Sequence, residues 1–147
     1  MQAQVLDANG TVRDYTALYI QFDRGAGDLI STTGDLNRFH RALREGRIIS
    51  RASLAEMEKA TPQSGKTGYG LGYTTENITA PGLIVQGHTG GYPGSFTFWY
   101  YLPETDTYLT YNVNYVGSME ETMQKMKTVR ADVFTHMKNN VLSRVSR

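Results

Sequence analysis

Residues 83–114 read LIVQGHTGGYPGSFTFWYYLPETDTYLTYNVN, and this stretch decides the fold. Runs rich in apolar, aromatic and β-branched residues are separated by turn residues, which predicts strands at 83–88, 95–102 and 107–114. Pro103-Glu104-Thr105-Asp106 has the composition of a turn that joins the last two strands into an antiparallel pair. Alternation in the middle strand puts its apolar side chains on one face, as a sheet core requires: Phe96, Phe98, Tyr100 and Leu102.

Helices are expected on either side of this stretch in the sequence. Thr32 and Asp35 have capping-box spacing at the start of a helix over 33–45, and a short helix begins at Ser50 or Ser53 and ends near Ala60. A long last helix begins near Ser118, with an apolar line at steps of three and four and basic residues elsewhere on its surface. The apolar line comprises Met123, Met126, Val129, Val133, Met137 and Val141, and the basic residues are Lys125, Lys127, Arg130 and Lys138.

The whole chain, residues 1–147, is the size of a single domain, and its class is α+β: an antiparallel sheet with flanking helices. A further strand is expected near 69–75. Asn9-Gly10, between two short β-favouring runs, predicts a marginal hairpin or an extended arm at the N-terminus.

Composition excludes several classes of function. Fifteen Lys and Arg against fourteen Asp and Glu give a net charge of +1, which indicates no polyanionic partner such as nucleic acid. The chain contains no cysteine, so disulfides and thiolate metal sites are excluded. No run is long and apolar enough for a membrane span, and the first 25 residues lack the pattern of a signal peptide.

Residues 60–70, ATPQSGKTGYG, permit two interpretations. Ala60 to Thr67 fit a relaxed phosphate-binding loop, but such a loop leaves a strand and enters a helix, whereas here a helix comes first and a glycine-rich run follows. Lys66-Thr67-Gly68 spells a box of penicillin-recognising serine enzymes, but it lies in a polar connection. His88-Thr89-Gly90, at the end of an apolar strand, is better placed.

The order AGDLISTTGDLNRFHRAL, YGLGY and GHTGGYPGSFTFWYYLPETDTYLTYNVN resembles the C-terminal part of the beta-lactamase-like serine hydrolases, over about residues 25–142. This family includes D-alanyl-D-alanine carboxypeptidases, class C beta-lactamases, D-aminopeptidases and related esterases. The resemblance implies a partial beta-lactamase/transpeptidase-like fold and maps the third active-site box to His88-Thr89-Gly90. Lys66-Thr67-Gly68 is then a coincidence.

The resemblance also implies roles for individual residues. His88 would supply a proton-handling and electrostatic edge to the cleft, Thr89 would donate its hydroxyl to a substrate carboxylate, and the N–H of Gly91 would form half of the oxyanion hole. Gly90 and Gly91 would leave room for a substrate lying along the strand. In the family this strand is an edge that borders the cleft, so His88, Thr89 and Gly91 are expected to be solvent-accessible.

One part of the family pattern is missing. The nucleophile lies in a Ser-x-x-Lys motif, and none of the eight serines has lysine three positions later. The nearest spellings, Thr122-x-x-Lys125 and Thr135-x-x-Lys138, fall inside the last helix, where a hydroxyl tends to bond its own backbone. We therefore interpret the chain as the distal part of a peptidase or esterase of the D-alanyl-D-alanine carboxypeptidase type, lacking the nucleophile segment and inactive alone. The alternative is a non-catalytic binding or interaction module that keeps the fold.

Other sites are less consistent with the sequence. The aromatic cluster at 96–101 could stack nucleic-acid bases, but residues 83–114 contain no Lys or Arg to form a basic groove. His40, His88 and His136 lie far apart with no second ligand at a suitable spacing, so neither a metal nor another cofactor is expected. A small-molecule or peptide substrate, and a periplasmic or secreted location, follow from the resemblance alone.

A last expectation concerns residues 107–114. In the family the equivalent strand has an additional partner from the N-terminal part, which this chain lacks. The strand is uncharged and contains no proline, so its open edge is a template for pairing. We expect either that residues 5–16 fold back onto it or that two chains form a homodimer through it.

Overall fold

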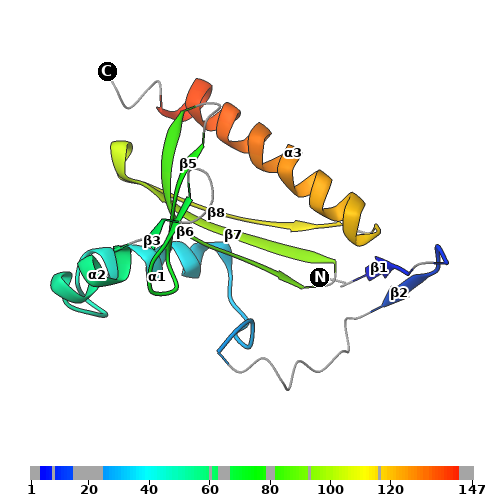
Figure 1. The fold of residues 1–147 in the computed structure, drawn as a ribbon, viewed down its shortest axis with the longest axis horizontal. Coiled ribbons are helices and arrows are strands. Elements are labelled where there is room, and N and C mark those ends of the chain that lie inside the picture. The colour runs from blue at the N-terminus through cyan, green and yellow to red at the C-terminus, as the bar shows by residue number, and fades with distance from the viewer. Residues whose placement is uncertain are drawn as a thin grey trace.

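The computed structural model describes most of the chain, namely residues 4–7, 9–14, 25–59, 61–62, 67–78, 82–92, 94–115 and 117–142. Its main feature is a six-stranded antiparallel sheet whose strands lie side by side in sequence order. The strands are β3 (Thr61–Pro62), β4 (Thr67–Tyr69), β5 (Thr74–Ile78), β6 (Leu83–Tyr92), β7 (Ser95–Leu102) and β8 (Thr107–Asn114). Helix α3 (Met119–Met137) covers one face, and helices α1 (Thr33–Arg44) and α2 (Arg51–Glu58) lie on the other (Figure 1). The expected α+β class is confirmed.

Strands β7 and β8 form the hairpin that the sequence predicts, with the same boundaries. They pair from Ser95↔Asn114 to Leu102↔Thr107. A short 3-10 turn, Pro103–Thr105, connects them, and Asp106 adopts the left-handed conformation (φ 48°) that Asp tolerates better than most residues.

The other two predicted strands differ from the structure. The segment expected as one strand at 69–75 is the end of β4, a turn in which Gly72 has φ 65°, and the start of β5. Strand β6 continues to Tyr92, four residues beyond the expected end, because β7 pairs with it along its whole second half. The strand boundaries predicted from residue propensity are wrong in both places, because pairing with neighbouring strands determines where each strand begins and ends.

Each of the three helices begins at a residue whose side chain caps it. Thr32 accepts a hydrogen bond from the Asp35 N–H at the start of α1, and Ser50 does the same for Ser53 at the start of α2. Ser118 and Glu121 form a complete capping box at the start of α3. All three helices are where the sequence places them, and α3 ends in a π-helical turn at Lys138–Leu142.

The main core lies between α3 and the sheet. Leu83 and Val85 of β6 and the apolar face of β7 pack there against Met126, Phe134 and Met137 of α3. The face assigned to Phe96, Phe98, Tyr100 and Leu102 is confirmed, so these aromatic residues are core rather than a stacking platform.

The apolar line predicted for the last helix, α3, is only partly right. Met123 is 47% exposed, whereas Phe134 is fully buried against Tyr100 although the sequence analysis did not include it. Arg130, expected on the open surface, is half-buried, pairs with Glu76 and lies over the Tyr100 ring. Met126 and Met137 are buried as predicted, so the buried face of the helix is shifted only slightly from the predicted line, away from Met123 and toward Arg130 and Phe134. Val141 has no described side chain.

Two short strands near the N-terminus, β1 (Gln4–Leu6) and β2 (Val12–Asp14), pair with each other as the expected hairpin. Asp7 supports the turn by accepting hydrogen bonds from the backbone N–H groups of Asn9 and Thr11. This hairpin forms its own sheet, so the expectation that residues 5–16 fold back onto 107–114 is wrong for its described part; residues 8, 15 and 16 lie outside the described residues. Within the described chain, β8 is the last strand of the main sheet.

Candidate active site

An open cleft of about 720 Å³ lies along the second half of β6. Strand β5 pairs with β6 only as far as Thr74↔Gly87, so residues 88–92 have β7 on one side and no β5 residue on the other. The cleft is lined by Gly25, Ala26, Gly27, Leu29, His88, Thr89, Gly90, Gly91, Tyr92, Ser95 and Thr97. The four predicted site residues therefore lie together, on the part of β6 that pairs with β7 and extends beyond the end of β5.

Gly87 marks the point where the two halves meet. Its φ of 150° is rare for residues with a side chain, and a Cβ there would overlap the carbonyl oxygen of Trp99. Thr74 holds the same position from β5 by donating its hydroxyl to the Gly87 carbonyl at 2.8 Å. Glycine is thus required at residue 87 so that β6 can approach β7 closely where β5 ends.

His88 is half-buried, and its ring contacts Tyr69 of β4. The Tyr69 hydroxyl lies 3.0 Å from His88 Nε2, and the rings meet edge to face with centroids 5.7 Å apart. His88 is the one histidine in the cleft lining, which includes no Asp, Glu, Lys or Arg among the described residues. The polar side chains of this described lining are hydroxyl groups and the His88 ring, and no lysine is among them.

Thr89, Gly90 and Gly91 are all exposed, as expected for residues that border a cleft. A Cβ at Gly90 would meet no atom within 4 Å, so this position leaves open space for a ligand. A Cβ at Gly91 would instead overlap the ring of Phe96, its cross-strand partner. The expectation that glycine at 91 makes room for substrate is thus corrected, because the ring of Phe96 occupies that space.

A row of polar side chains that the sequence analysis missed continues the cleft across β7 to β8. Asn112 donates its amide to Thr97 Oγ1 at 2.8 Å and to Ser95 Oγ at 3.2 Å. These hydroxyl groups can then donate in turn, because each accepts from Asn112. Alternation within β7 placed Ser95 and Thr97 on one face, but only the β7–β8 register brings Asn112 to them.

A second network that the sequence analysis missed lies between α1 and the sheet. His40 is fully buried, its ring centroid is 3.9 Å from that of Trp99, and its Nε2 lies 2.6 Å from the Tyr73 hydroxyl. Burial, with a smaller effect from nearby Arg44, lowers the pKa of His40 to about 3, and burial raises the pKa of Tyr73 to about 12. Both groups are therefore neutral near pH 7 and stabilise the structure rather than exchange protons.

The competing motifs do not form sites. Thr67 and Gly68 belong to β4 rather than to a connecting loop, and Lys66 lies outside the described residues. Thr122 is buried and donates its hydroxyl to the Ser118 carbonyl at 2.7 Å, as expected for a threonine inside a helix.

No helix in the described part of the chain is long and apolar enough to cross a membrane. The described residues also contain no group of three or more side chains that could hold a metal ion.

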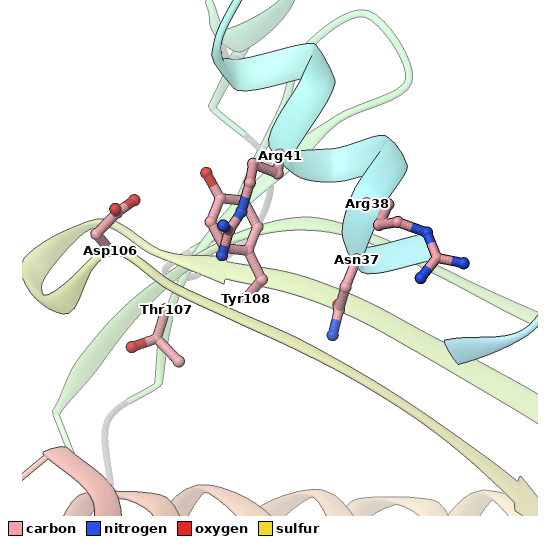
Figure 2. Close-up of a pocket in the computed structure, with 6 residues that line it drawn as sticks. All are labelled: Asn37, Arg38, Arg41, Asp106, Thr107 and Tyr108. Carbon is pink, nitrogen blue, oxygen red and sulfur yellow. The ribbon is translucent and has the colours of Figure 1, made fainter. Parts of the chain in front are cut away.

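A smaller hollow of about 380 Å³ lies at the other end of the sheet, between α1 and the start of β8 (Figure 2). Arg41 lies over the ring of Tyr108, with its guanidinium carbon 5.2 Å from the ring centroid. Arg38 points away from this pair and is held by Asp35 instead. The polar groups of this hollow do not converge on one point, so the cleft at His88 is the better candidate site.

Comparison with known proteins supports the family resemblance that the sequence indicates. The beta-lactamase family matches residues 2–132. Penicillin-binding protein 4* of Bacillus subtilis (strain 168) is 37% identical over 82 residues, which are 54% of this chain and 18% of that protein.

Two solved structures are similar in fold as well as sequence. The D-stereospecific amidohydrolase from Streptomyces sp. has a TM-score of 0.68 and 31% identity, over 78% of this chain and 34% of that one. The D-amino acid amidase from Ochrobactrum anthropi SV3, complexed with D-phenylalanine, has a TM-score of 0.50 and 26% identity, over 60% of this chain and 30% of that one. The chain thus spans about a third or less of the length of these relatives.

Proposed function

Because the chain belongs to the beta-lactamase family, we propose that it forms the His-Thr-Gly side of the substrate cleft in a serine hydrolase of the D-alanyl-D-alanine carboxypeptidase type. The observation that carries the proposal is the open half of β6, which presents His88, Thr89 and Gly90 to one cleft. The substrate would be a small molecule or peptide with a D-amino acid next to the scissile carbonyl. The relatives named for D-stereospecific and D-amino acid hydrolysis support this substrate class.

Each residue then has a distinct task. The Thr89 hydroxyl, exposed at the cleft, binds the substrate carboxylate, and His88 provides a polar ring beside it. The backbone N–H of Gly91 contributes to the oxyanion hole. Gly90 leaves space for the substrate main chain, since nothing lies within 4 Å of a Cβ built there.

The 147-residue chain by itself is proposed to be inactive, because no serine in it has lysine three positions later. Incubation with a β-lactam or a fluorophosphonate probe should give no adduct by mass spectrometry. A stoichiometric adduct on any serine or threonine would show that the nucleophile is in this chain. A reading frame that continues upstream of Met1 into Ser-x-x-Lys would support the catalytic form of the proposal.

Binding can be tested without the nucleophile. We expect D-alanyl-D-alanine to shift the NMR signals of the backbone amides of residues 88–91, and L-alanyl-L-alanine to shift them much less. Thr89→Val removes the hydroxyl and keeps the shape of the side chain, so it should weaken binding of D-alanyl-D-alanine about tenfold, as expected for a hydrogen bond to a charged group.

D-phenylalaninamide, which has no carboxylate, serves as the control ligand. Its binding should not depend on the Thr89 hydroxyl. Equal shifts with the two enantiomers, or shifts confined to another surface, would favour the alternative that the chain is a non-catalytic interaction module.

We further propose that residues 1–147 are one domain and that the protein is periplasmic or secreted. Cell fractionation tests the proposed location.

A further inference from the structure

The Tyr69-Gly70-Leu71-Gly72-Tyr73 turn connects β4 to β5 and is held in place at several points along its length. The Leu71 N–H donates to the Met57 carbonyl at 3.0 Å, and the Gly70 N–H donates to the Tyr73 carbonyl at 2.8 Å. A Cβ at Gly70 would overlap that Met57 carbonyl, so glycine allows the turn to lie directly against the end of α2. The backbone of this turn therefore has little freedom to shift.

The far end of the turn is anchored in the interior. Tyr73 is 1% exposed, and its hydroxyl lies 2.6 Å from Nε2 of the buried His40. Its ring also meets the ring of Trp99 edge to face, with centroids 6.2 Å apart. Because a buried hydroxyl without a partner is costly, this hydrogen bond fixes where the turn ends.

The near end of the turn reaches the candidate active site. Thr61 donates its hydroxyl to the Tyr69 carbonyl at 3.0 Å, and the Tyr69 side chain meets His88 across β5. Nε2 of His88 has the Tyr69 hydroxyl as its hydrogen-bond partner, at 3.0 Å. A phenol donates readily, and a bare imidazole nitrogen accepts.

From these contacts we infer that Tyr69 is a positioning residue for His88, whose O–H donates to Nε2 and so keeps the proton of the neutral ring on Nδ1. The tautomer of a histidine is set by the hydrogen bond at its other nitrogen. The role of His88 at the cleft rests on the proposed function, whereas the tautomer itself does not. In this state His88 meets a substrate as an N–H donor from Nδ1, so it stabilises negative charge on a substrate oxygen rather than removing a proton.

The inference is tested on the ¹⁵N-labelled 147-residue chain by NMR at a pH where His88 is neutral. The ¹⁵N shifts of the two ring nitrogens distinguish the bare one from the one that carries the proton. We expect the wild-type chain to have a bare Nε2 and a protonated Nδ1. A proton mainly on Nε2 in the wild-type chain would overturn the inference without any variant.

Tyr69→Phe keeps the aromatic ring and removes the donor. The ratio of the Nδ1–H to the Nε2–H tautomer should fall by about tenfold, since a hydrogen bond of ordinary net strength biases the two forms by that amount. Tyr92→Phe, which removes a phenol hydroxyl from the lining of the same cleft, is the matched control and should leave the ratio unchanged. An unchanged ratio in Tyr69→Phe, or an equal change in both variants, would overturn the inference.

The same samples separate this inference from the proposed function. Stereoselective binding of D-alanyl-D-alanine together with a proton on Nε2 would overturn only the role of Tyr69. The expected tautomer together with no binding would support the Tyr69–His88 contact and overturn the proposed function.

Discussion

The two halves of β6 have opposite properties although they form one continuous strand. Residues 83–87 pair with β5, and the last two of them also pair with β7; Leu83, Val85 and Gly87 are buried. Residues 88–92 pair with β7 alone, and none of them is buried. The candidate active site thus begins where the neighbouring strand β5 ends, at Gly87, whose own backbone conformation is also unusual.

The largest effect is expected where the halves meet. Gly87→Ala would place a Cβ against the Trp99 carbonyl at a φ that side chains avoid, so we expect a loss of about 3 kcal/mol in the free energy of unfolding. Urea unfolding followed by circular dichroism measures it. A loss below about 1 kcal/mol would mean that the two strands separate easily at this point, and the division of β6 would not depend on Gly87.

The second effect concerns the two histidines in contact with the β6–β7 sheet. His40 is buried beneath Trp99, whereas His88 is paired with Trp99 across the strands and lies at the cleft. Burial lowers the pKa of His40 from 6.5 to about 3, so below pH 6.5 the unfolded chain binds a proton that the folded chain does not. Stability is therefore complete above pH 6.5 and falls as the pH drops, by about 1.4 kcal/mol per unit.

The measurement is the free energy of unfolding between about pH 6.5 and about pH 5, over which we expect a loss of about 2 kcal/mol. His40→Gln removes the titrating group and should flatten this part of the profile, although the variant is expected to be less stable near pH 7, where neutral His40 packs well. A profile with the same slope in the variant and the wild-type chain would exclude His40 as the cause.

The third effect compares residues 88–92 of β6 with β8, the last strand of the main sheet in the described part of the chain. The β6 half contains Gly90 and Gly91, whereas β8 is a regular strand of eight residues without charge or proline. We propose that two chains associate through β8, and light scattering should then show a dimer. Thr110→Pro removes one backbone donor and should weaken association at least tenfold.

Thr110 also donates its hydroxyl to Asn37 of α1 at 2.6 Å, so the proline variant changes two contacts. Thr110→Val is the matched control, because it removes the hydroxyl and keeps the backbone N–H. Association should persist in Thr110→Val. A monomer at all concentrations, or equal weakening in both variants, would argue against pairing through this edge.

The smallest effect on stability is expected at Gly90. A Cβ there meets no atom within 4 Å, so Gly90→Ala should change the free energy of unfolding by no more than about 0.5 kcal/mol. The same variant should nevertheless reduce the NMR shifts caused by D-alanyl-D-alanine, because the methyl group enters the cleft. A large loss of stability at Gly90 would remove the contrast with Gly87.

Features that depend on residues close together in the chain could be predicted from the sequence alone. The alternation in 95–102 and 107–114 predicted both strands with the boundaries they have, and Thr32 and Ser118 identified the starts of α1 and α3, while α2 begins at the first of its two candidate caps, Ser50 and Ser53. The order of motifs around His88-Thr89-Gly90 gave the family and the location of the cleft. These features were accessible because alternation, capping and motif order are properties of residues a few positions apart.

Features that depend on strand register and on burial could be seen only in the folded chain. The last β5 pair at Gly87 and the contact of Tyr69 with His88 result from how three strands align, and no local pattern specifies that alignment. The burial of His40 and Phe134, and the exposure of Met123, depend on how α1 and α3 are rotated against the sheet. A helical stripe allows several such rotations, and the packing of side chains from distant segments selects one of them.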